Sequence, residues 1–180
     1  MQPRLTRRGA LGVAAVTLAS CGGGDAPPSN RPRAGSGAGL LNSIVALENA
    51  AVAAWAAIGD VLTGDARRYA ATIRERELRH AERVGQLVTE LGGTPPEGRP
   101  ADEYASLFPR MNDEADALHF ARDLEERLLR AYLDALRSLP DSSQRRAAAE
   151  IAAEEAQDLA VVNVLAGGPA APQPFVTGTL

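Results

Sequence analysis

The chain has 180 residues and a single cysteine, so it is long enough for one ordinary domain but has no internal disulfide and no cysteine-based zinc site. Apolar residues make up 45% and aromatic residues only 4%, so aliphatic side chains and alanine must fill the core. The formal charge is −4, which gives no general reason to expect nucleic acid as a partner.

Residues 1–20 predict a secretory signal peptide. Arg7 and Arg8 precede a short apolar run at 11–19, and no acidic residue lies among them. This order is typical of an export signal, and the run is too short to span a bilayer. Residues 6–11 also resemble a twin-arginine signal, the route for folded proteins, although general secretion stays open.

The only cysteine lies at the end of this signal. Residues 18–21, Leu-Ala-Ser-Cys, resemble a bacterial lipobox, in which the cysteine is acylated and becomes the mature N-terminus. We therefore expect Cys21 to anchor an exported protein to the outer face of the cytoplasmic membrane, in the cell envelope. An ordinary signal with an incidental cysteine is the alternative. Residues 21–39 are rich in Gly, Pro and Ser and predict a flexible linker between lipid and domain.

From Leu40 onward the apolar pattern has a helical period, which predicts an all-α fold over 40–166 and a flexible tail over 167–180. Short connections join the first two and the last two helices, whereas a long segment rich in Gly and Pro joins the second to the third. Asp65 and Asp141 are the expected N-caps of the second and fourth helices. The pattern thus predicts two helical hairpins joined by a long crossover, with helices at 40–60, 65–92, 113–139 and 141–166.

The two predicted hairpins resemble each other. Glu48 precedes Trp55 as Glu125 precedes Tyr132, and the pair Glu77 and His80 corresponds to the pair Glu155 and Asp158. The offsets of the two matches agree to within one residue. This similarity indicates a duplicated hairpin, whose halves would pack with approximate two-fold symmetry.

An acidic residue interrupts the apolar stripe of every predicted helix near its middle. Because helical spacing keeps a stripe on one face, these residues should point inward at one level. Burying several ionised carboxylates together costs several kcal/mol each unless positive charge lies among them, and two divalent cations would supply it. Carboxylates with one imidazole suit iron or manganese, with zinc as a further option. The residues at this level are Glu48, Glu77, His80, Glu125, Glu155 and Asp158.

This pattern resembles the ferritin-like superfamily, and in particular bacterial secreted ferritin-like domain proteins. Its di-iron carboxylate four-helix bundles use one Glu from each of two helices and a Glu-x-x-His pair from each of the other two. Glu48 and Glu125 match the single positions, and Glu77 with His80 matches the first pair. The second pair departs from the pattern, because Asp158 stands where His is expected. The site could therefore bind two metals, favour a harder ion, or be a relic with one weak site.

The resemblance implies a membrane-tethered protein with an iron or manganese di-metal centre that oxidises iron or handles reactive oxygen. The alternative is a metal-free envelope scaffold, in which Arg122 would pair with Glu125 and Arg74 with Glu77. We expect Trp55 to be a core residue and His119 to lie off the acidic level. Whether the protein is an enzyme, and whether it forms a homodimer, stays open.

Overall fold

The computed structural model describes residues 37–172, which form five helices and no strand. The predicted signal peptide, Cys21 and the predicted linker up to residue 36 lie outside the described residues, as does the predicted tail from residue 173. The helices are α1 (Gly37–Val61), α2 (Gly64–Glu90), α3 (Ala101–Ala105), α4 (Glu114–Ser138) and α5 (Ser142–Leu165).

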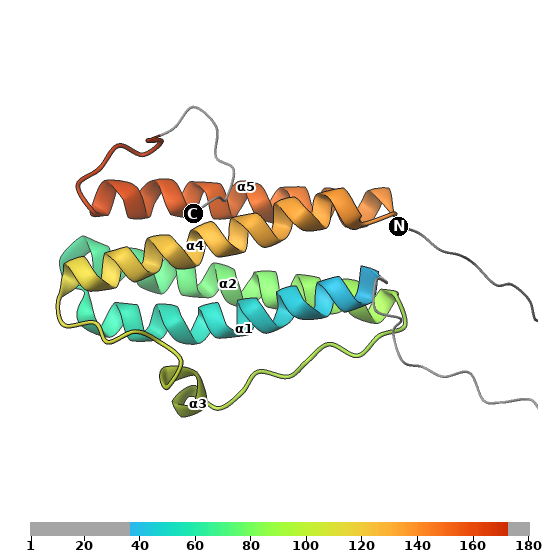
Figure 1. Cartoon of the computed structure of the whole chain (residues 1–180), viewed down its shortest axis with the longest axis horizontal. Coiled ribbons are helices and arrows are strands. Elements are labelled where there is room, and N and C mark those ends of the chain that lie inside the picture. The colour runs from blue at the N-terminus through green and yellow to red at the C-terminus, as the bar shows by residue number, and fades with distance from the viewer. Residues whose placement is uncertain (1–36, 173–180) are drawn as a thin grey trace, which may run out of the picture.

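The four long helices form a bundle of two hairpins (Figure 1). α1 packs against α2 and α4, and α5 packs against α4 and α2, so each long helix has two neighbours around the ring. After α2 the chain returns along the outside of α1 through α3, so that α4 starts at the end of the bundle where α2 also starts. The predicted all-α bundle with a long crossover is confirmed.

Two of the helix starts are capped by aspartate side chains. Asp113 accepts a hydrogen bond from the backbone N–H of Asp116 before α4, and Asp141 accepts from those of Ser143 and Gln144 before α5. These side chains satisfy backbone donors that the first helical turn leaves unpaired. The expected cap at Asp141 is confirmed.

The expected cap at Asp65 is wrong. The N-cap position of α2 is Thr63, whose side chain makes no capping bond, and Asp65 is the second residue of the helix, within its first turn. Gly64 begins α2 with a φ of +53°, in the left-handed region that only glycine adopts readily. Because the buried Leu62 keeps the connection tight, the chain turns on this glycine instead of on a capping side chain.

Three smaller expectations also differ from the structure. α1 starts at Gly37, ahead of Leu40, because Ala38 is buried and extends the packed turn. The crossover contains a short helix, α3, which buries Tyr104 and follows Pro100. α2 ends at Glu90, ahead of the expected end at residue 92, and Leu91 just beyond it is 40% exposed.

The core consists of two apolar clusters. One lies towards the start of α1 and includes Leu41, Leu87 and Tyr132; the other lies towards its end and includes Trp55 and Ile73. On α1 and α2 the residues of the acidic level fall between the two clusters, and on α4 and α5 they have buried apolar residues on both sides. The bundle therefore places a polar layer between two apolar blocks.

Among residues 37–172, α1 is the helix that is long and apolar enough to cross a membrane by length and composition. This is weak evidence for a span, because the central helix of a bundle meets the same criterion. α1 also carries Glu48, which the bundle buries completely.

Candidate metal centre

The six residues of the acidic level all lie inside the bundle. The five carboxylates are fully buried and His80 is 4% exposed. α1 and α4 contribute one residue each, whereas α2 and α5 contribute two each, three residues apart on one helical face. The structure therefore brings together every candidate that the sequence pattern selects. They are Glu48, Glu77, His80, Glu125, Glu155 and Asp158.

Most of the oxygens in this layer have no hydrogen-bond donor. Both carboxylate oxygens of Glu77 and of Glu155 lack one, as does one oxygen each of Glu48, Glu125 and Asp158. His80 Nδ1 lies close to Glu155 and Glu77 but without the geometry of a hydrogen bond. Buried polar atoms are nearly always hydrogen-bonded in folded proteins, so such a cluster of unpartnered atoms needs a specific explanation. A cation bound among them would be one.

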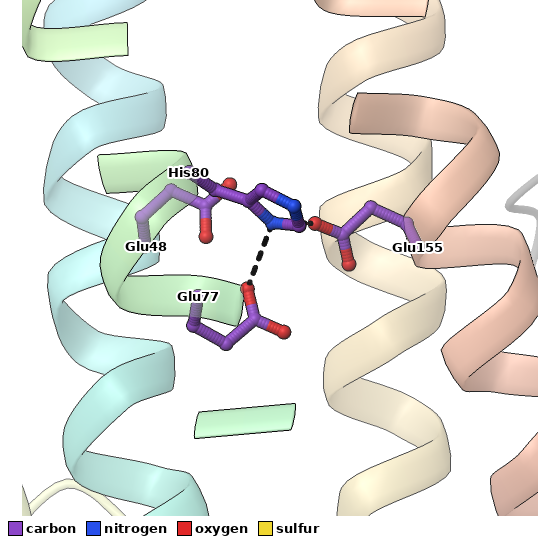
Figure 2. A group of neighbouring side chains, drawn as sticks. All are labelled: Glu48, Glu77, His80 and Glu155. Carbon is purple, nitrogen blue, oxygen red and sulfur yellow. Dashed lines mark ion pairs between the residues drawn. The ribbon is translucent and has the colours of Figure 1, made fainter. Parts of the chain in front are cut away.

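The ligand atoms fall into two overlapping groups, each with members within 4.8 Å of one another. Glu48, Glu77, His80 and Glu155 form the first group, which we call the histidine half. Figure 2 shows the His80 ring between Glu77 and Glu155, with His80 Nδ1 3.5 Å from Glu77 Oε2 and 2.9 Å from Glu155 Oε1.

The second group, which we call the aspartate half, consists of Glu77, Glu125 and Asp158. Glu77 belongs to both halves and has both of its oxygens without a donor. This carboxylate would therefore be a ligand to a cation in either half. All six residues fit a centre of one or two divalent cations with oxygen ligands and one imidazole.

Two aromatic residues hold carboxylates of the opposite hairpin. Trp55 on α1 donates its indole N–H to Glu125 Oε1 on α4 at 2.8 Å, and Tyr132 on α4 donates its hydroxyl to Glu48 Oε1 on α1. In both residues the second oxygen stays free of hydrogen bonds. This reciprocal exchange fits the two-fold relation that the internal similarity predicts. Trp55 is a core residue as expected, and it also orients a carboxylate.

Two further contacts join α2 to α5 beside the layer. His80 Nε2 lies 3.0 Å from Glu154 Oε2, and Arg76 pairs with Asp158 Oδ1. A carboxylate on the outer imidazole nitrogen fixes the ring so that its other nitrogen, Nδ1, can face a metal. Asp158 Oδ2 has no hydrogen bond, so the ion pair leaves one oxygen available.

Burial and mutual repulsion raise the pKa of the carboxyl groups in the metal-free protein. For Glu48 and Glu125, burial raises the pKa well above the usual value, and neighbouring carboxylates add to the effect. Burial also raises the pKa of Glu155 to about 7 and that of Asp158 to about 6, although the Arg76 charge opposes the shift of Asp158.

The imidazole of His80 has a much higher affinity for its proton than a free histidine. Burial by itself would lower the pKa of His80, but its contacts with Glu155 and Glu77 outweigh burial and raise it to about 11. In the metal-free protein His80 is therefore a cation within the layer. A bound metal would take the place of that proton, because a ligating imidazole is neutral.

The arginines expected to neutralise the layer in a metal-free scaffold do not do so. Arg122 contacts His119 and Asp123, and Trp55 is the donor to Glu125. Arg74 is exposed, and both oxygens of Glu77 lack a donor. His119 is exposed and lies off the layer, as expected.

Arg76 and Glu154 were not among the candidates selected by the apolar stripes. The internal similarity contained a usable signal, because Arg76 and Glu154 occupy corresponding positions one turn before His80 and Asp158. Their contacts cross from one hairpin to the other, however, and only the packing of α2 against α5 shows that they meet.

Two hairpins joined by a long crossover, with carboxylates and an imidazole buried at one level, define a ferritin-like four-helix bundle. The chain belongs to the family described as the ferritin-like domain, whose model matches residues 36–168. A crystal structure of a conserved hypothetical protein from Mycobacterium tuberculosis is similar, with a TM-score of 0.65 and 16% sequence identity over 74% of this chain and 99% of that chain. At this identity the likeness shows the fold alone. A comparison with curated proteins gave no match.

Proposed function

We propose that the buried layer binds two divalent cations, iron or manganese, and that the protein uses them to oxidise iron or to handle reactive oxygen in the cell envelope. The observation that carries this proposal is the convergence of unpartnered buried oxygens and His80 Nδ1 in one layer. Membership of the ferritin-like domain family supports it.

The residues of the chain have distinct tasks in this proposal. Glu77, which belongs to both halves, would be a ligand in either one, and Glu155 would be a ligand in the histidine half. In the metal-free protein both carboxylates contact the ring of His80. Glu48 and Glu125 would each offer one oxygen, since Tyr132 and Trp55 occupy the other. A bound redox-active metal would supply electron transfer to dioxygen or peroxide. The apolar clusters on both sides would keep bulk water away from the layer.

Metal analysis and thermal unfolding of the purified domain test this proposal. We expect iron or manganese in the protein as isolated, and a higher Tm with metal than without. Binding to the folded state alone stabilises by about 2.7 kcal/mol at a hundredfold excess over Kd. Glu125→Gln should abolish this gain, because the amide still accepts from Trp55 but provides no charged ligand. The exposed Glu82→Gln is the matched control and should keep the gain.

The competing function is a metal-free scaffold or binding module. The bonds of Trp55, Tyr132 and Arg76 to three of the carboxylates favour it, since they satisfy part of the layer without metal. A scaffold would contain no metal, and its unfolding curves with and without iron or manganese would superimpose. That result would remove the metal centre and leave the fold.

We also propose that the protein is exported and held at the membrane by a lipid on Cys21. The basic start, the apolar run and the lipobox-like residues support this. Cys21→Ser should move the protein from the membrane fraction to the soluble envelope fraction or the medium. Unchanged membrane association of this variant would contradict the anchor. Export that survives replacement of Arg7 and Arg8 by lysine would indicate general secretion.

A further inference from the structure

The two contacts between α2 and α5 occupy corresponding positions but have opposite charge. In the histidine half, Glu154 lies on the outer nitrogen of His80. In the aspartate half, Arg76 lies on the outer oxygen of Asp158. The outer contact is thus made by an anion in the histidine half, where it supports an imidazole. In the aspartate half it is made by a cation, which pairs with a carboxylate.

Because of this difference, the two halves should bind a divalent cation with unequal affinity. In the histidine half, Glu154 adds negative charge outside a ligand that becomes neutral when it binds metal. In the aspartate half, the positive charge of Arg76 already neutralises Asp158, and that half has one ligand fewer. A divalent cation at Asp158 Oδ2 would share one carboxylate with a guanidinium.

Arg76 can be either a competitor of that cation or a group that orients its ligand. Repulsion between a guanidinium and a divalent cation on the same carboxylate is large at such short range, even with the screening near a protein surface. Holding one carboxylate in place by a single hydrogen bond contributes much less. Competition should therefore dominate.

We propose that Arg76 is a built-in competitor of the second metal, so that the layer binds cations in two unequal steps, first in the histidine half and then, more weakly, in the aspartate half. This inference rests on the proposed metal centre. The side chain of Arg76 is 24% exposed whereas that of Asp158 is 1% exposed. Arg76 can thus turn towards solvent when a second cation arrives, without disturbing the core.

Titration of the metal-free protein with Mn²⁺ tests the proposal, with calorimetry for the affinities and electron paramagnetic resonance for coupling between neighbouring ions. The wild type should show a tight first step and a weaker second one, or no second one. Arg76→Met should tighten the second step by about tenfold or more and leave the first unchanged, because it removes a repelling charge. Arg74→Met, which removes an exposed charge from the same helix, should change neither step.

Two more variants make the test decisive. Arg76→Gln should act like Arg76→Met, and circular dichroism should show the helical content of the wild type in both. Asp158→Asn should remove the second step and keep the first. The proposal is overturned if Arg76→Met weakens or does not change the second step, or if Asp158→Asn removes the first. A wild type that binds no Mn²⁺ or Fe²⁺ at all would instead contradict the proposed function, and this inference with it.

Discussion

At the scale of single residues, the layer depends on donors that leave one oxygen of a carboxylate free. Trp55, Tyr132 and Arg76 each donate to one oxygen of a different carboxylate, and the other oxygen stays without a partner. Donors arranged in this way orient a carboxylate and leave its second oxygen available to a cation. Together with the protonated His80, they support the layer when no metal is bound.

Tyr132 offers a clean test of this support. In the metal-free protein, Tyr132→Phe should lower the free energy of unfolding by about 1–2 kcal/mol, because Glu48 Oε1 loses its donor while it stays buried. Urea unfolding measures this difference. Tyr69→Phe is the control and should have little effect, since Tyr69 is 42% exposed. Equal stability of the wild type and Tyr132→Phe would mean that the hydroxyl does not support Glu48.

At the scale of helices, the position of each acidic residue along its helix decides whether the acidic residues form a common layer. Each long helix is apolar on both sides of its acidic residue, so aligning the apolar faces also aligns the acids. The short connections within each hairpin keep this alignment. The ends of the helices then determine how firmly each hairpin holds its register.

The two aspartates expected to cap helices should behave differently. Asp141→Ala should lower Tm by about 2–4 °C, because the backbone N–H groups of Ser143 and Gln144 lose their acceptor. Asp65→Ala should have little effect, since its side chain makes no capping bond and pairs only with the exposed Arg68. Thermal unfolding of both variants measures the contrast. Equal losses would contradict the assignment of the caps.

At the scale of the whole molecule, the layer makes the stability of the folded protein depend on pH. The pKa values of Glu155, about 7, and Asp158, about 6, lie above those of free carboxyl groups, and those of Glu48 and Glu125 are raised too. The folded protein therefore holds more protons than the unfolded chain above about pH 4. His80 acts in the same direction, because its pKa rises from 6.5 to about 11.

The metal-free protein should consequently lose stability as pH rises. We expect Tm to fall steadily between about pH 5 and about pH 8, since the carboxyl groups must ionise while they are buried together. The stabilisation by metal should show the opposite trend and grow with pH, because metal competes with protons for the same ligands. Calorimetric scans across this range, with and without Mn²⁺, measure both trends. A metal-free Tm that rises with pH would contradict the repulsion described for the layer.

Local sequence patterns were sufficient to predict the four long helices, the crossover and the inward direction of the six residues of the layer. These features depend on local periodicity, because a residue such as Glu48 or Glu125 on an apolar helical stripe has to be buried with that stripe. The internal similarity also predicted that the two hairpins would be related by approximate two-fold symmetry. The exchanged bonds of Trp55 and Tyr132 fit that relation.

The partners of the buried groups could not be predicted in this way, because they depend on the packing of the helices. Arg122 and Arg74 are close to Glu125 and Glu77 along the chain, but the rotation of α4 and α2 directs both arginines elsewhere. Arg76 meets Asp158 because α2 and α5 are neighbours in the bundle, a contact between residues far apart in the chain. Helical periodicity tells which face of a helix is buried, whereas the identity of a partner depends on how separate helices pack together.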